Sequence, residues 1–193
     1  MTHEDPDLTL VQALKLGQDK ALNALMDRHR EGLFRFVFRH VHNEADALEL
    51  AMETFVRAYF NIEKFRPAAR FATWLYQIAL NLCRDHLRSR AYRDSQQTAS
   101  FDAPAYEGGD PNLLLTSDHG PDQKTDRREE VIALEKAISE LPEDLKTGFI
   151  LTALEDRPQA ETAALLGISL KAVEMKVYRA RKLLLEKMSK MGF

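Results

Sequence analysis

The chain has 193 residues, of which 45% are hydrophobic and 30% are charged, and it contains only 8 glycines. This length allows one ordinary domain or two small ones, and the composition is typical of helix-rich proteins. No apolar run approaches the length of a membrane span, and a single cysteine, Cys83, excludes an internal disulfide. We therefore expect a cytoplasmic protein without membrane insertion.

The net charge of −3 conceals an uneven distribution along the chain. Residues 63–93 hold seven Lys and Arg against two Asp and Glu, and residues 157–193 hold eight against three, a net of +5 in each segment. Residues 94–126 hold one basic residue against seven acidic ones, a net of −6. Two basic segments separated by an acidic one favour two contacts with a polyanion, and ordinary charged helix surfaces are the alternative explanation.

Apolar residues recur at helical spacing through the first half of the chain, which predicts four helices there. Gly17 ends the first helix, and Asp19 and Asn43 are suitable N-terminal caps for the second and third. The expected ranges are residues 8–16, 20–41, 44–62 and 70–89. In the second helix, we expect these side chains to face inward: Leu22, Leu25, Met26, Leu33, Val37 and Val41.

The fourth predicted helix has two distinct faces. Phe71, Leu75, Ile78 and Leu82 form a narrow apolar stripe that predicts the core side. The residues of a second stripe, spaced by three and four, are Trp74, Gln77, Asn81, Arg84 and Arg88. An aromatic ring, two amides and two cations on one face are the side chains that hold unpaired nucleotides by stacking and by phosphate contact. A half-buried tryptophan beside a solvated basic edge is the alternative.

The helical pattern stops between residues 93 and 126, where Gly, Pro, Ser and Asp are abundant. We interpret this segment as a flexible acidic linker. The pattern resumes at about Arg127, with one helix to Glu140 and another from LPED (141–144) to about Glu155. The sequence thus predicts an all-α fold of two small helical domains, residues 1–92 and 127–193, joined by the linker 93–126.

The C-terminal segment has the spacing of a helix-turn-helix, and an ordinary helical hairpin with a basic tail is the alternative. A short helix at about 158–166 precedes Gly167, and Ser169 can cap a long last helix. Ala163 is small enough to let the two helices approach, and Val173 closes their core. We expect Leu170, Val173, Val177, Ala180 and Leu184 to face inward. The face opposite them, which suits entry into the major groove, contains Lys171, Met175, Tyr178, Arg179 and Lys182.

Three ordered segments together resemble the bacterial sigma-70 family of RNA polymerase factors, in particular its compact extracytoplasmic-function (ECF) type. They are ADALELAMETFVRAY, FRPAARFATWLYQIALN and ISELPEDLKTGFILTALEDRPQAETAALLGISLKAVEMKVYRAR. The resemblance covers roughly residues 8–92 and 127–188. It implies a sigma region 2 bundle and a C-terminal region 4, which direct core polymerase to promoters and help to open the DNA.

The resemblance also implies roles for individual residues. The stripe from Trp74 to Arg88 corresponds to the segment that recognises and melts the −10 element. Contact with core polymerase, at the clamp helices of the largest subunit, is implied for Asp46, Ala47, Glu49, Leu50, Glu53 and Phe55. Recognition of the −35 duplex is implied for Ser169, Lys171, Glu174, Met175, Lys176, Tyr178, Arg179 and Lys182. Further implied partners are the polymerase flap and an anti-sigma factor, and the acidic linker is implied to enter polymerase channels.

Three segments depart from the family pattern, and one of them is the entry to the helix-turn-helix, where Arg157 and Pro158 replace the usual residues. Leu48, Glu49, Ala51 and Met52 interrupt the usual acidic clamp-binding sequence, which implies an altered polymerase contact. Glu174 stands where a cation commonly faces DNA, so the usual −35 sequence is not expected; its carboxylate either accepts from a cytosine amino group or turns aside.

The sequence contains no Gly-rich phosphate loop, no plausible nucleophile–base pair and no metal-ligand cluster, so we expect no enzymatic activity, no cofactor and no metal. Two other hypotheses remain at this point. One is a conventional regulator that binds an operator as a dimer, and the long linker disfavours it because half-site spacing must be fixed. The other is a protein-interaction module that binds polymerase without recognising promoters.

Overall fold

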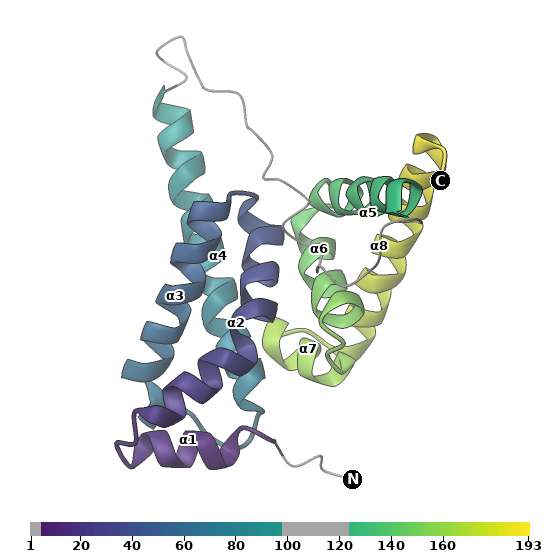
Figure 1. Ribbon diagram of the computed structural model, residues 1–193. Coiled ribbons are helices and arrows are strands. Elements are labelled where there is room, and N and C mark those ends of the chain that lie inside the picture. Colours follow the sequence, from purple (N-terminus) through teal and green to yellow (C-terminus); the bar gives the residue numbers. More distant parts are fainter. Residues whose placement is uncertain (1–4, 98–123) are drawn as a thin grey trace. The chain divides into compact units, whose positions relative to one another are not determined.

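The computed structural model describes residues 5–97 and 124–193, with side chains for residues 5–91 and 129–193 (Figure 1). The chain divides into two compact units, residues 1–108 and 109–193. Every regular element in the described ranges is helical, which confirms the all-α prediction. None of these helices is long and apolar enough to cross a membrane.

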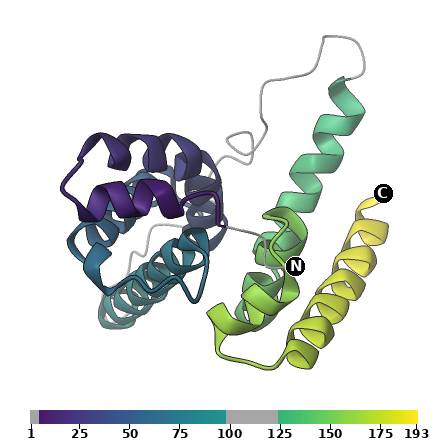
Figure 2. The ribbon, with the colours of Figure 1, turned by 90° about the horizontal axis from the view of Figure 1, so that it is seen from below.

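In the described residues, the first unit is a bundle of four α-helices, α1 (Leu8–Lys15), α2 (Lys20–Val41), α3 (Glu44–Phe60) and α4 (Phe71–Gln97). Helices α2, α3 and α4 pack against one another, and α1 packs against α2 (Figures 1 and 2). A short 3-10 turn, Ile62–Lys64, lies between α3 and α4. Helix α4 extends beyond its predicted end near Ser89, into the range assigned to the linker.

The core of this unit agrees in part with the apolar stripes of the sequence. On α2, Leu25, Leu33, Val37 and Val41 are buried as predicted, whereas Leu22 and Met26 are only half-buried. On α4, Phe71, Leu75 and Leu82 are buried and Ile78 is half-buried. The core is wider than the predicted stripes, and it also includes Phe36, Phe38, Tyr76, Ala79, Leu80 and Cys83.

One of the two predicted caps in this unit is present. Asn43 Oδ1 accepts a hydrogen bond of 2.9 Å from the Asp46 N–H, which caps α3. Asp19 precedes α2 but makes no capping hydrogen bond, so that prediction is wrong. The backbone of Asp19 is already helical (φ −57°, ψ −25°), whereas a capping residue is normally extended, and its Oδ1 instead accepts from the Tyr59 hydroxyl of α3 at 3.3 Å.

The second unit consists of α5 (Lys124–Ser139), α6 (Glu143–Phe149), α7 (Gln159–Leu166) and α8 (Leu170–Met191). Helix α8 contacts each of the other three (Figure 2). A single helix was expected up to Glu155, but α6 ends at Phe149 and a π-helical turn, Ile150–Leu154, follows. The Glu155 N–H donates to the Ile150 carbonyl at 3.0 Å, one residue further back than in an α-helix.

The turn between α7 and α8 has the predicted helix-turn-helix details. Gly167 adopts a left-handed conformation (φ 66°) that glycine reaches without steric cost. Ser169 Oγ accepts from the Ala172 N–H at 3.2 Å and caps α8. Ala163 and Val173 are buried in one cluster with Val177, against which Ile168 packs. Leu170 is 47% exposed, so its predicted inward position is wrong. Leu170 is the first residue of α8, and the buried positions of this helix begin at Val173.

Most of the predicted linker lies outside the described residues. The two ends of the predicted linker are described and are helical, because α4 continues to Gln97 and α5 begins at Lys124.

Candidate nucleic-acid interface

The second stripe of α4, here called the α4 polar face, comprises Trp74, Gln77, Asn81, Arg84 and Arg88. Asn81, Arg84 and Arg88 are exposed, and Trp74 and Gln77 are half-buried. Gln77 Nε2 donates to Asn81 Oδ1 at 3.4 Å, so these two amides are neighbours on the helix surface. The bundle therefore leaves amide and guanidinium groups accessible along more than three turns of one helix.

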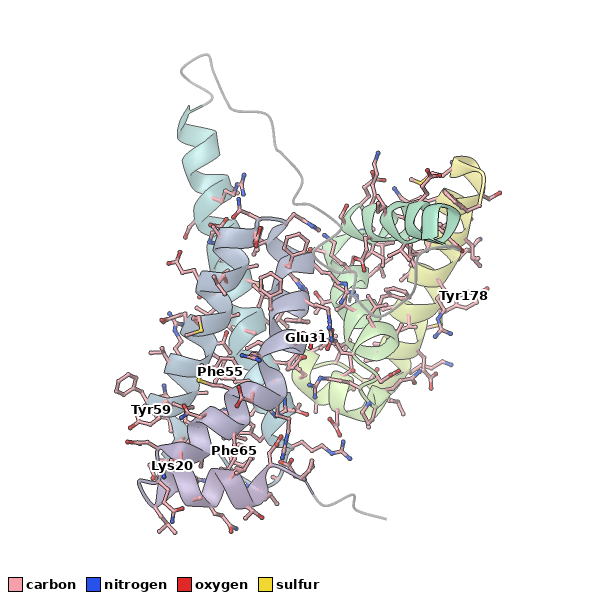
Figure 3. The ribbon with its side chains drawn as sticks, in the orientation of Figure 1. Lys20, Glu31, Phe55, Tyr59, Phe65 and Tyr178 are labelled. Atoms are coloured by element: carbon pink, nitrogen blue, oxygen red, sulfur yellow. The ribbon has the colours of Figure 1, made fainter. Side chains whose placement is uncertain are left out.

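Trp74 belongs to an aromatic cluster with Phe65 and Phe71. Its ring centroid lies 5.5 Å from that of Phe65 and 5.9 Å from that of Phe71, with tilted planes. Both phenylalanines are buried, and Phe65 can be followed in Figure 3. Trp74 thus packs against two buried apolar rings, and its side chain as a whole is only half-buried. A supported indole loses little entropy when a base stacks on it.

A second polar surface follows the exposed side of α8. Lys171, Met175, Tyr178, Arg179 and Lys182 are all exposed, as predicted from helical spacing. Tyr178 is 66% exposed and projects outward from the helix (Figure 3). Val173, Val177, Ala180 and Leu184 are buried on the opposite side. This arrangement leaves an aromatic ring and three cationic side chains exposed along one side of α8.

Two cations near the start of α8 are paired with carboxylates. Lys176 Nζ lies 2.8 Å from Asp144 Oδ2 of α6, and Lys171 Nζ lies 3.2 Å from Glu174 Oε2. Further along α8, Lys187 pairs with Glu140, which lies after α5, and this hydrogen bond lowers the pKa of the Glu140 carboxyl. The Lys176 pair connects α8 to α6, and the Lys187 pair connects α8 to the residue that follows α5.

The residues for which the resemblance implies polymerase contact occupy two sides of α3. Glu49 is exposed, and Leu50 and Glu53 are half-buried, with Glu53 paired to Arg57 at 2.7 Å. Asp46 is half-buried, and its Oδ2 lies 3.2 Å from His86 Nε2 of α4. Ala47 and Phe55 are buried in the bundle, where they cannot touch a partner directly (Figure 3 labels Phe55).

The exposed side of α3 has an apolar stripe that sequence reasoning did not single out. Its members recur every four residues, and their exposed fractions are 58% for Leu48, 47% for Met52, 44% for Val56 and 78% for Phe60. The opposite side packs inward with smaller residues, Ala47, Ala51, Thr54 and Ala58, together with Phe55. The four-residue repeat was visible in the sequence, but it gives no indication of which side faces the core.

Comparison with known proteins identifies both units. Residues 25–93 match Sigma-70 region 2, and residues 132–184 match Sigma-70, region 4. The RNA polymerase sigma-H factor of Pseudomonas aeruginosa is 30% identical over 184 residues, which cover 94% of this chain and 93% of the relative. The chain belongs to the sigma-70 family. Its ECF type is supported by the ECF sigma-E factor of Escherichia coli, which is 28% identical over 183 residues, 94% of each chain.

Solved structures of sigma factors have the same fold. CnrH, solved in complex with the cytosolic domain of CnrY, is 25% identical, with a TM-score of 0.70 over 96% of this chain and 99% of that one. In sequence, the CnrH factor of Cupriavidus metallidurans is 32% identical over 94% of this chain and 93% of the relative. RpoE from Bartonella quintana, 19% identical, shares the fold with a TM-score of 0.67 over 88% of this chain and 98% of that one.

This sigma factor directs core RNA polymerase to promoters in transcription initiation, and it therefore binds both the polymerase and promoter DNA. The family assignment therefore supports the sigma-factor hypothesis over the dimeric regulator and the protein-interaction module. The roles of individual residues remain to be argued from the two surfaces described above.

Proposed function

We propose that the α4 polar face holds the separated non-template strand of the −10 element. The observation that supports this most directly is the exposure of Asn81, Arg84 and Arg88 in line with a supported, half-buried Trp74. Extruding a base costs a few kcal/mol, and stacking on an aromatic side chain returns about 1–3 kcal/mol per base. Amides can contact base edges, and the two arginines can follow the phosphates, so strand separation needs no nucleotide hydrolysis.

The exposed side of α8 is proposed to bind the −35 duplex. Arg179 and Lys182 suit phosphate contacts, which position the helix, and residues in its first turns suit contact with base edges. The cap at Ser169 keeps the start of the helix regular, where entry into the major groove takes place. Glu174 is held beside Lys171, so its carboxylate lies among these residues and departs from the usual family chemistry.

The polymerase contact is proposed to centre on the exposed side of α3. Glu49 and Glu53 retain the acidic character expected of it, and Leu48, Met52, Val56 and Phe60 add apolar surface. Leu48 and Met52 are two of the residues that depart from the family pattern. The contact would therefore depend more on apolar burial, and less on charge, than the acidic family sequence implies.

Regulation by an anti-sigma partner is part of this proposal. Support comes from the relative CnrH, which was solved in complex with the cytosolic domain of CnrY. We further propose a cytoplasmic location, no catalytic chemistry of the chain's own, and a connecting role for the acidic segment 93–126. A partner of this kind would block both polymerase binding and transcription when added to the purified factor.

The experiment that tests the −10 proposal is transcription with core polymerase on duplex promoters and on matched promoters with a pre-melted −10 region. Trp74→Ala or Asn81→Ala should reduce open complexes on the duplex by at least about five-fold more than on the pre-melted template. Arg30→Ala, on the exposed side of α2, is a matched control. Equal losses on both templates would reject the melting role. Polymerase binding without promoter-specific initiation by the unaltered chain would favour the interaction-module hypothesis.

A further inference from the structure

The segment before α1 supplies a cap for α4. Asp5 Oδ2 accepts a hydrogen bond of 2.6 Å from the backbone N–H of Phe71, the first residue of α4, which lies 66 positions along the chain. The first N–H groups of a helix have no acceptor within the helix, and a negative charge there interacts favourably with the helix dipole. Asp5 therefore performs for α4 what a local N-cap performs for α3 and α8.

Asp5 is itself held in place by its neighbours. Its Oδ1 accepts from the Asp7 N–H at 3.1 Å, and the Asp7 carboxylate is buried against α2. There Asp7 pairs with Arg28 and lies 2.8 Å from His29 Nε2, while Arg28 Nη1 also donates to the Pro6 carbonyl at 3.1 Å. We call residues 5–7 the N-terminal latch.

The latch connects to the aromatic cluster around Trp74. The His29 ring that contacts Asp7 also lies 5.9 Å from the Phe71 ring, and Phe71 in turn packs against Trp74. A separate contact from α1 reaches the other phenylalanine, since Lys15 Nζ donates to the Phe65 carbonyl at 3.0 Å. Both residues that support Trp74 are thus tied to the N-terminal part of the chain.

We infer that Asp5 is a positioning residue for promoter opening, and that the latch fixes the first turn of α4 so that Trp74 is presented in one orientation. The inference rests on the proposed function, because it assumes that the α4 polar face engages a separated strand. Without the cap, the first turn of α4 frays and Trp74 samples several orientations. The entropy lost when Trp74 is fixed in one orientation then opposes strand capture. The polymerase surface on α3 is unaffected.

Trp74 is the single tryptophan of the chain, so its fluorescence reports on this cluster alone. In the full-length Asp5→Ala variant, we expect greater quenching of Trp74 by acrylamide and a red-shifted emission. Open complexes on duplex promoters should fall about five-fold, the factor that corresponds to about 1 kcal/mol for a lost cap. Open complexes on pre-melted promoters and affinity for core polymerase should change much less. Asp5→Asn keeps one acceptor oxygen and should restore part of the loss.

Asp27→Ala is the matched control, because Asp27 is an exposed carboxylate of the same unit whose nearest cation, on Arg30, lies 3.8 Å away. It should leave quenching and opening unchanged. Wild-type quenching and wild-type opening of duplex promoters in Asp5→Ala would overturn the inference, as would equal losses on duplex and pre-melted templates. If Trp74→Ala itself lacks a duplex-specific defect, the proposed function fails. In that case the quenching measurement still decides whether Asp5 positions Trp74.

Discussion

Lys176 of α8 is paired with Asp144 of α6, with 2.8 Å between Nζ and Oδ2. Lys176 is one of the cations for which a −35 contact is expected, and in this structure an acidic neighbour competes for it. Because a partly exposed ion pair contributes little to stability, the carboxylate can be neutralised without loss of the fold. Neutralising the Asp144 carboxylate increases the net positive charge that α8 presents to DNA.

We expect Asp144→Asn to raise affinity for duplex DNA of any sequence by a few-fold. The slope of log affinity against log salt concentration should also become steeper by about one, because Lys176 becomes free to contact a phosphate and to displace its counterion. Fluorescence anisotropy titrations at several salt concentrations measure both quantities. Glu186→Gln is the control, since Glu186 is an exposed carboxylate of α8 and its neutralisation changes the net charge by the same amount. An unchanged salt slope in Asp144→Asn would show that Lys176 does not reach the backbone.

Glu174 offers a test of base recognition by α8. A carboxylate can accept from the cytosine amino group, which no cation can do. We therefore expect Glu174→Gln to alter the preferred base at one −35 position, with little change elsewhere, when transcripts from a promoter library are sequenced. Lys171→Ala should instead weaken all promoters to a similar extent. A uniform effect of Glu174→Gln across the library would mean that its carboxylate only pairs with Lys171.

The two sides of α3 should respond differently to substitution. Met52→Glu places a charge in the exposed apolar stripe, and we expect affinity for core polymerase to fall by about ten-fold at an unchanged melting temperature. Phe55→Ala removes a buried ring, which typically costs about 3–5 kcal/mol of unfolding free energy. Competition binding and thermal denaturation separate these effects. Polymerase affinity at the wild-type level in Met52→Glu would exclude the stripe from the contact.

The Asp7 carboxyl makes the unfolding free energy of the first unit depend on pH. Burial raises the pKa of its carboxyl, but the hydrogen bonds and charges of His29 and Arg28 outweigh burial and hold the pKa below the ordinary value of 3.8. The folded state therefore binds the proton less tightly than the unfolded state. The resulting stabilisation is complete well above pH 3.8, and it is lost as the pH falls through the lower, folded-state pKa.

Urea unfolding followed by Trp74 fluorescence between about pH 2 and pH 7 tests this prediction. Asp7→Asn should be less stable than wild type by about 1–3 kcal/mol at neutral pH, and the difference should shrink at the acidic end. A difference that stays constant over the whole range would assign the loss to packing alone.

The sequence was sufficient for features that depend on residues close together in the chain. The three- and four-residue spacing from Trp74 to Arg88 determines one helix face, whatever surrounds the helix. The spacing of Ala163, Gly167 and Val173 likewise determines the helix-turn-helix, and the caps at Asn43 and Ser169 need only the next turn of chain. These features are local, so periodicity and side-chain chemistry predict them.

Tertiary structure alone decided which of two plausible faces was covered. Helix α3 has one side with Leu48, Met52 and Val56 and another with small alanines, and periodicity does not rank them. The alanine side is inside because small side chains let α2 and α4 approach closely, which leaves the larger apolar residues outside. The hydrogen bond from Phe71 to Asp5 is equally non-local, since only the folded bundle brings together residues 66 positions apart.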